Sequence, residues 1–190
     1  MKKIDIEELL KKSNEEIHSF FKKDNTQLLI ELLNIALENS FCDIMEHLCN
    51  CIKKKEITKN DKIIYQCDEI AGTVSVLIDL FNYTKKEQYE ILKNKITIEY
   101  TDLNKKIFAT AAITKNTFEE TNFVLSKLKK HIEYGTDLKK VNLDFINFVG
   151  LLNAYITLIM DIFDISDEEL NNSYNCKKDL LFKKFGRDSK

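Results

Sequence analysis

The stretch KKVNLDFINFVGLLNAYITLIMDIF, residues 139–163, is the most apolar part of the chain and indicates its fold class. Apolar side chains occupy most of the circumference of a helix drawn through it. The polar side chains share one stripe, made of Asp144, Asn147, Asn153, Thr157, Asp161 and Asp164, with Gly150 in line. A helix that is apolar nearly all round is enclosed by other helices. We therefore expect residues 139–163 to form the central helix of a bundle.

Helical periodicity extends to both sides of this stretch. Apolar residues recur at three- and four-residue spacing over about 5–23, 26–54 and 61–82. The polar stretch between the last two ranges predicts a connection there. These patterns predict three amphipathic helices before residue 83.

Three capping boxes predict three further helix starts. In each, a hydroxyl residue precedes a glutamate by three positions: Thr84 with Glu87, Thr117 with Glu120, and Ser166 with Glu169. The helix after Thr84 is expected to reach Ile113, and the helix after Thr117 to end at Gly135. These two helices would form an antiparallel hairpin. Residues 93–102 (KNKITIEYTD) alternate as a strand does, but no partner strand is evident, so we expect them to be helical.

The composition supports the same fold class. Hydrophobic residues make up 44% and charged residues 32%, enough for a single buried core. Four Gly and no Pro are too few for the tight turns of an all-β fold. No repeat or linker is evident. The sequence predicts an all-α, single-domain bundle over 1–190, with six or seven helices around residues 139–163.

Charge and composition also limit the functions and locations that we expect. The formal net charge is −2 and Arg187 is the only arginine, which argues against nucleic-acid binding. No stretch matches an uncharged membrane span, since Val141–Phe163 includes Asp144 and Asp161, and the first residues lack the apolar core of a secretory signal. We expect a cytoplasmic protein without membrane contact. The bias towards Lys, Ile and Asn predicts an AT-rich genome.

The cysteines form the best candidate for a metal site. Cys42, His47, Cys49 and Cys51 lie close in sequence, and Cys67 follows in the next predicted helix. Zinc sites usually use CxxC spacing, which is missing here. Five cysteines are an odd number without the spacing of a disulfide scaffold. The prediction is reduced cysteines and no bound zinc.

No other pattern points to catalysis. The chain has no glycine-rich phosphate loop and no strand–turn–helix elbow for a nucleophile. We therefore expect no catalytic residues, no metal and no cofactor.

Two stretches resemble all-α nucleotide pyrophosphatases. IELLNIALENSF (30–41) resembles the ExxE helix of dimeric dUTPase and MazG-like proteins, and DISDEELNNSYNCKKDLLFKK (164–184) looks like their closing helix. The resemblance implies Mg²⁺-dependent hydrolysis of nucleotides. The carboxylate pairs of that family are incomplete here: Glu31 is paired with Asn34, and Asp144 with Asn147. The resemblance therefore implies an inactive or divergent relative.

A second resemblance is architectural. A nearly all-apolar central helix among about six amphipathic helices is similar to viral Bcl-2-like proteins, which bind helices in a surface groove. The chain lacks their Asn-Trp-Gly-Arg sequence. This resemblance implies capture of a partner helix.

The leading prediction is a non-catalytic helical protein that acts through protein–protein contacts. Regulators, inhibitors, immunity proteins and chaperones of phage or host origin would fit, with another protein or a second copy as the partner. The candidate partner-binding residues lie on the last predicted helix: Leu170, Tyr174, Leu181, Phe182 and Phe185. The alternative for this helix is packing against its own bundle.

Overall fold

The regular secondary structure is entirely α-helical in the residues that the computed structural model describes, which are 26–80, 84–134 and 142–173. The helices are α2 (Thr26–Lys54), α3 (Asp61–Leu80), α4 (Lys85–Leu92), α5 (Leu103–Glu133) and α6 (Asn142–Phe163). Residues 167–173 are helical as well. The prediction of an all-α fold is confirmed. The helix expected over 5–23 lies outside the described residues, and the single domain over 1–190 stays a prediction.

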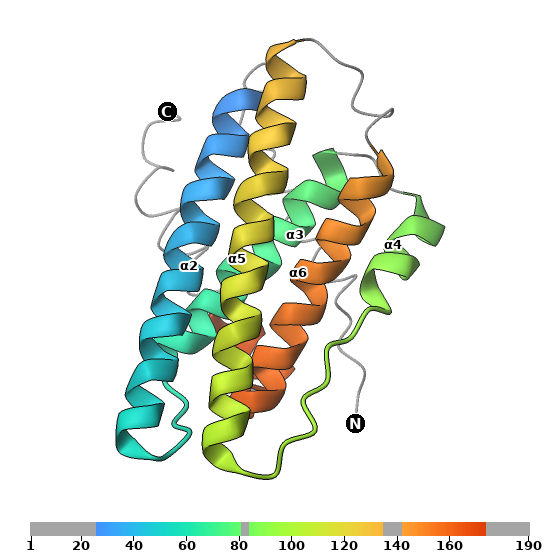
Figure 1. Cartoon of the computed structure of the whole chain (residues 1–190). Helices are drawn as coiled ribbons and strands as arrows, with labels where there is room; N and C mark the ends of the chain where they lie inside the picture. Colours follow the sequence, from blue (N-terminus) through green and yellow to red (C-terminus); the bar gives the residue numbers. More distant parts are fainter. Residues whose placement is uncertain (1–25, 81–83, 135–141, 174–190) are drawn as a thin grey trace, which may run out of the picture.

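Four of the helices form a closed bundle. Helix α2 packs against α3 and α5, and α6 packs against the same two helices. Neighbouring helices run antiparallel, so α3 and α5 are diagonal partners that run in the same direction (Figure 1). Helix α4 lies outside this ring and packs against α6.

Helix α6 supplies much of the core, in agreement with the apolar pattern of residues 139–163. The stretch Phe145–Phe163 is long and apolar enough to cross a membrane by length and composition, but 72% of it is buried inside the protein. The Tyr155 ring lies 5.2 Å from the Phe41 ring of α2, and its hydroxyl donates to Thr114 Oγ1 of α5 at 3.0 Å. This buried hydrogen bond joins the central helix to its neighbour.

The helix predicted from Thr84 to Ile113 is wrong, and so is the hairpin that follows from it. Helix α4 ends at Leu92, residues 94–102 are not helical, and α5 continues without a break through Thr117. Because α3 and α5 run in the same direction, the chain must return along the bundle between them (Figure 1). Nine extended residues span about 30 Å, whereas nine helical residues span about 14 Å. An extended segment therefore covers about twice the distance that a helix of the same number of residues would cover along this return path.

Residues 94–102 use the strand-like alternation without pairing to another strand among the described residues. Ile96 and Ile98 pack against the core, while Lys95, Thr97 and Glu99 are exposed. The predicted helix over 93–102 is wrong because this inward–outward pattern fits an extended segment lying on helices.

Two of the three capping boxes are confirmed. Thr84 Oγ1 accepts from the Glu87 amide at 3.3 Å, and the Ser166 hydroxyl accepts from the Glu169 amide at 3.2 Å. Thr117 is not a cap, since it lies buried in the middle of α5. Helix α5 begins instead after Asp102, whose side chain accepts from the Lys105 amide at 2.9 Å.

Candidate functional site

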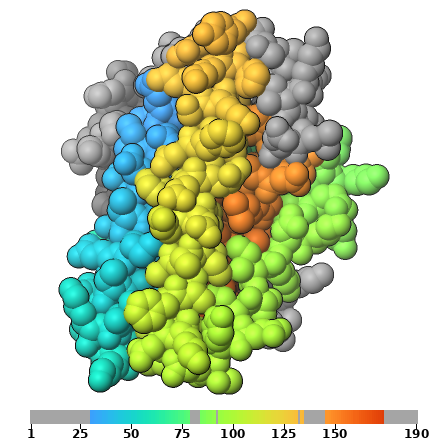
Figure 2. Space-filling model, viewed as in Figure 1, coloured from blue at the N-terminus to red at the C-terminus, as the bar shows by residue number. Residues whose placement is uncertain are grey.

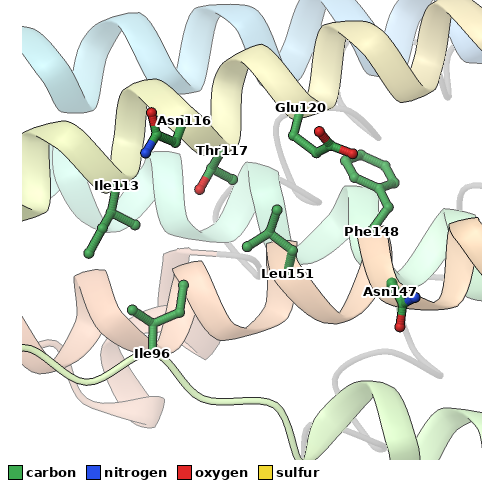
Figure 3. A pocket seen from close by; sticks show the side chains of 8 residues that line it. All are labelled: Ile96, Ile113, Asn116, Thr117, Glu120, Asn147, Phe148 and Leu151. Atoms are coloured by element: carbon green, nitrogen blue, oxygen red, sulfur yellow. The ribbon is translucent and has the colours of Figure 1, made fainter.

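A cavity of about 470 Å³ opens between α5, α6 and the extended segment 94–100. Figure 2 shows the surface hollowed between α5 and the α4 region, with α6 visible in the hollow. The lining residues are Ile96, Ile113, Asn116, Thr117, Glu120, Asn147, Phe148 and Leu151 (Figure 3).

Helical spacing builds two of its walls. Ile113, Asn116, Thr117 and Glu120 follow i, i+3, i+4 and i+7 spacing, so they share one face of α5. The α6 wall consists of Asn147, Phe148 and Leu151. Ile96 closes the third side from the extended segment (Figure 3).

Gly150 brings the extended segment close to α6. A Cβ atom at Gly150 would lie 2.4 Å from Asn94 Nδ2, which is closer than atoms can pack. The same Nδ2 donates to the carbonyl of Glu90 at 3.0 Å and so helps to end α4. The missing side chain at Gly150 therefore leaves room for the Asn94 side chain in this position, two residues before Ile96.

The hydroxyl of Thr117 faces the cavity. Thr110, Thr114 and Thr121 on the same helix each donate to the carbonyl four residues earlier, at 2.7–2.8 Å. The Thr117 hydroxyl makes no hydrogen bond to any residue that the structure describes, although Thr117 is only 1% exposed. Its oxygen is directed into the cavity (Figure 3). Among the described residues, Thr117 Oγ1 is not one of the buried side-chain atoms that lack a partner, so water in the cavity reaches it.

Apolar and polar residues are mixed around the cavity. Ile96 and Ile113 lie on one side with Asn116 and Thr117, Leu151 lies in the middle, and Glu120 lies on the other side with Phe148 and Asn147 (Figure 3). Glu120 is exposed and forms no ion pair with the described residues, whereas its neighbour Glu119 pairs with Lys115 at 3.4 Å. Glu120 is thus an uncompensated negative charge at the edge of an apolar hollow.

The predicted partner-binding residues are only partly described. Leu170 is 4% exposed and belongs to the hydrophobic core. Tyr174, Leu181, Phe182 and Phe185 lie outside the described residues. Partner binding by this last helix stays a prediction.

The candidate cysteine cluster is dispersed. Cys42 and Cys49 are exposed, whereas Cys51 and Cys67 are buried. His47 Nε2 donates to the Thr58 carbonyl at 2.6 Å and thereby holds the connection between α2 and α3. Among the described residues, no three His, Cys, Asp or Glu side chains are grouped as a metal site would require.

Glu31, the carboxylate in the stretch that resembles the pyrophosphatases, pairs with a lysine in the fold. Glu31 Oε1 accepts from Lys129 Nζ of α5 at 2.6 Å. Its charge is therefore compensated by a lysine that joins α2 to α5.

No protein-family model, curated protein or solved structure matches this chain. The cavity is therefore argued from its own residues. Sequence reasoning missed it because Thr117 and Glu120 match a helix start, while Ile96 lies in a segment predicted to be helical. The available signals were the alternation at residues 96–98 and the interruption of the apolar surface at Asn147 and Gly150.

Proposed function

We propose that this protein is a non-catalytic binding protein that acts through protein–protein contacts, and that the cavity between α5, α6 and residues 94–100 receives a side chain of the partner. The observation that carries the proposal is the open cavity, whose lining combines Ile96, Ile113 and Leu151 with polar residues and which the Thr117 hydroxyl faces. Regulators, inhibitors, immunity proteins and chaperones share this mode of action.

The size and lining of the cavity support this proposal. About 470 Å³ is within the range of pockets that bind ligands or large side chains. In protein interfaces, a few anchor side chains fill such pockets, and a surrounding polar rim excludes water. Here Ile113 and Leu151 are half-buried, while Asn116, Glu120 and Asn147 are exposed around them.

The openness of the cavity favours a macromolecular partner. Its exposed rim residues lie on both α5 and α6. A side chain can enter this hollow while the rest of its chain lies across the two helices. Such docking would bury the rim together with the anchor.

Site-specific cross-linking in cells tests the proposal. A photoreactive amino acid at Asn116, on the rim, should cross-link one partner, identified by mass spectrometry of the joined peptides. The matched control carries the same amino acid at Phe108, which is 59% exposed on a different face of α5. With the purified partner, Ile113→Ala should weaken binding about tenfold, because it removes about three carbons from the apolar wall. Ile35→Ala, on α2 and 54% exposed, should leave binding unchanged.

Two results would contradict the proposal. In the first, positions 116 and 108 give the same set of cross-linked peptides, and the Ile113→Ala variant binds the partner with the affinity of the original chain. The other is Mg²⁺-dependent release of pyrophosphate from nucleotides by the purified protein, which would favour the pyrophosphatase resemblance instead.

A further inference from the structure

We infer that the cavity selects a basic side chain, a lysine or arginine of the protein partner, whose alkyl stem lies against Ile96, Ile113 and Leu151 and whose charged end meets Glu120. This inference rests on the proposed function and specifies the chemistry of the anchor. It starts from the lining, in which the carboxylate of Glu120 shares one cavity with the apolar side chains of Ile96, Ile113 and Leu151.

The charge of the lining points to a cation. Glu120 is the one charged residue among the eight that line the cavity, and it forms no ion pair with the described part of the chain. A docked partner would remove water from this carboxylate. Loss of hydration without a new partner is costly for a carboxylate, and an anionic occupant would add repulsion. A positively charged group compensates both effects more strongly than a neutral donor does, because its hydrogen bonds to the carboxylate are charge-assisted.

The apolar walls point to a long stem in front of that charge. Lysine and arginine bury three or four methylene groups while the charged end remains among polar atoms. The half-buried side chains of Ile113 and Leu151 offer such a stem an apolar surface, with Ile96 opposite (Figure 3). A cation without such a stem would leave these apolar side chains exposed to water.

The polar atoms match the donors of such a group. An ammonium has three N–H donors and a guanidinium has five, and neither accepts a hydrogen bond. The Thr117 hydroxyl, whose oxygen is directed into the cavity in Figure 3, and the Glu120 carboxylate can both accept. The Phe148 ring, beside Glu120 in Figure 3, adds an aromatic face of the kind that attracts cations.

Small probes separate the charge from the apolar stem. We would titrate the full chain with n-hexylammonium, 1-hexanol and hexanoate, and follow the backbone amides of α5 and α6 by NMR. The ammonium should shift the amides around Thr117 and Leu151 and bind about fivefold more tightly than hexanol, as expected for an exposed ion pair. Hexanoate should bind more weakly than either.

Two Glu→Gln substitutions, one in the cavity and one beside it, provide a test variant and its control. Glu120→Gln should abolish the preference for the ammonium and leave hexanol binding unchanged. Glu119→Gln, one residue away and already paired with Lys115, should preserve the preference. Added salt should reduce the preference of the original chain and have no effect on the Glu120→Gln variant.

The outcomes distinguish this inference from the proposed function. Equal binding of all three probes, or an unchanged preference in Glu120→Gln, would overturn the cationic anchor while leaving an apolar anchor site. If no probe binds and the Ile113→Ala variant keeps its affinity for the partner, both the cationic anchor and the proposed function would be overturned.

The protein source of the cation is tested by competition. Hexylammonium should reduce cross-linking of the partner from position 116, and the cross-linked partner peptide should contain a lysine or arginine whose change to alanine weakens binding. Hexylammonium binding without loss of the partner cross-link would overturn the inference, as would a cross-link between two copies of this chain.

Discussion

Lys55 adopts a backbone conformation that glycine usually occupies, in a chain with only four glycines. It follows α2 with φ 56°, in the left-handed region, and the amide of Glu56 donates to the Cys51 carbonyl at 3.1 Å. This is the helix ending that usually uses glycine. A lysine here has a conformational cost that its contacts must offset.

Lys55→Gly should therefore stabilise the protein. Relief of the left-handed conformation should raise the free energy of unfolding by about 0.5–1 kcal/mol, measured by urea denaturation. Lys54→Gly, one residue earlier and inside α2, should lower it by about 0.5–1 kcal/mol. Equal destabilisation by both glycines would show that position 55 has no such cost.

The four thiols in the described part of the chain should fall into two classes by reactivity in the folded protein. Cys42 and Cys49 are exposed, whereas Cys51 and Cys67 are 1% and 0% exposed. Burial also raises the pKa of the Cys67 thiol, which keeps it protonated and unreactive. Differential alkylation read by mass spectrometry should label Cys42 and Cys49 first, and Cys51 and Cys67 only on unfolding. Fast labelling of Cys67 would contradict its place in the core.

Between elements, the contact of α6 with the end of α4 depends on Gly150. Gly150→Ala alone should be neutral or destabilising, because its Cβ displaces the Asn94 side chain and breaks the bond to the Glu90 carbonyl. In an Asn94→Ala background the same change should stabilise by about 0.5–1 kcal/mol, since alanine is the better helix former. A double-mutant cycle in urea measures the difference. Additive effects would show that the two side chains do not compete for space.

Lys59 joins the α2–α3 connection to the end of α6 and the next helix. Its Nζ donates to the Asp164 carbonyl at 2.7 Å and pairs with Glu169 Oε1 at 2.7 Å. Hydrogen bonds from Lys59 and from the backbone and side chain of Ser166 lower the pKa of Glu169 to about 2. These contacts link residues 105 positions apart.

Stability should therefore depend on the ionisation of Glu169. An unfolded glutamate has a pKa near about 4.3, so the stabilisation is complete above that pH and disappears as pH falls towards about 2. Glu169→Gln should be less stable than the original chain at pH 6, and the two should converge near pH 2 in urea titrations. Glu168→Gln, at the exposed neighbour, is the control and should follow the original profile. A constant difference at every pH would contradict the linkage.

At the scale of the whole molecule, the helical residues 167–173 contribute Leu170 to the core. Leu170 is buried, and its amide donates to the Ser166 carbonyl at 3.1 Å. The functional prediction for residues beyond it must therefore be separated from this packing. Two truncations make that separation.

Truncation after Ile165 should lower the free energy of unfolding by at least about 2 kcal/mol, because it removes Leu170 and the Lys59–Glu169 pair. Truncation after Ser173 retains both, so its free energy of unfolding should exceed that of the form truncated after Ile165. Loss of the partner in the longer truncated form would support partner binding by Tyr174, Leu181, Phe182 and Phe185. Full stability after truncation at Ile165 would contradict the core position of Leu170.

Helix type and the inward faces were predictable from the sequence because both depend on local periodicity. The bounds of α2 and α3, the apolar character of α6 and the caps at Thr84 and Ser166 all involve residues within a few turns of each other. Each is set by hydrogen bonds and side-chain spacing along one helix.

The route of the chain between α4 and α5, and with it the cavity, depended on contacts between distant residues. The capping pattern at Thr117 was overridden because α5 packs along its length against α2 and α6, which stabilises an unbroken helix. Residues 94–102 are extended because α3 and α5 run in the same direction, so the chain must cross the length of the bundle between them. Ile96 and Glu120 share a cavity only through that return path; the alternation at residues 96–98 indicates an extended segment, but it does not show which helices the segment lies against.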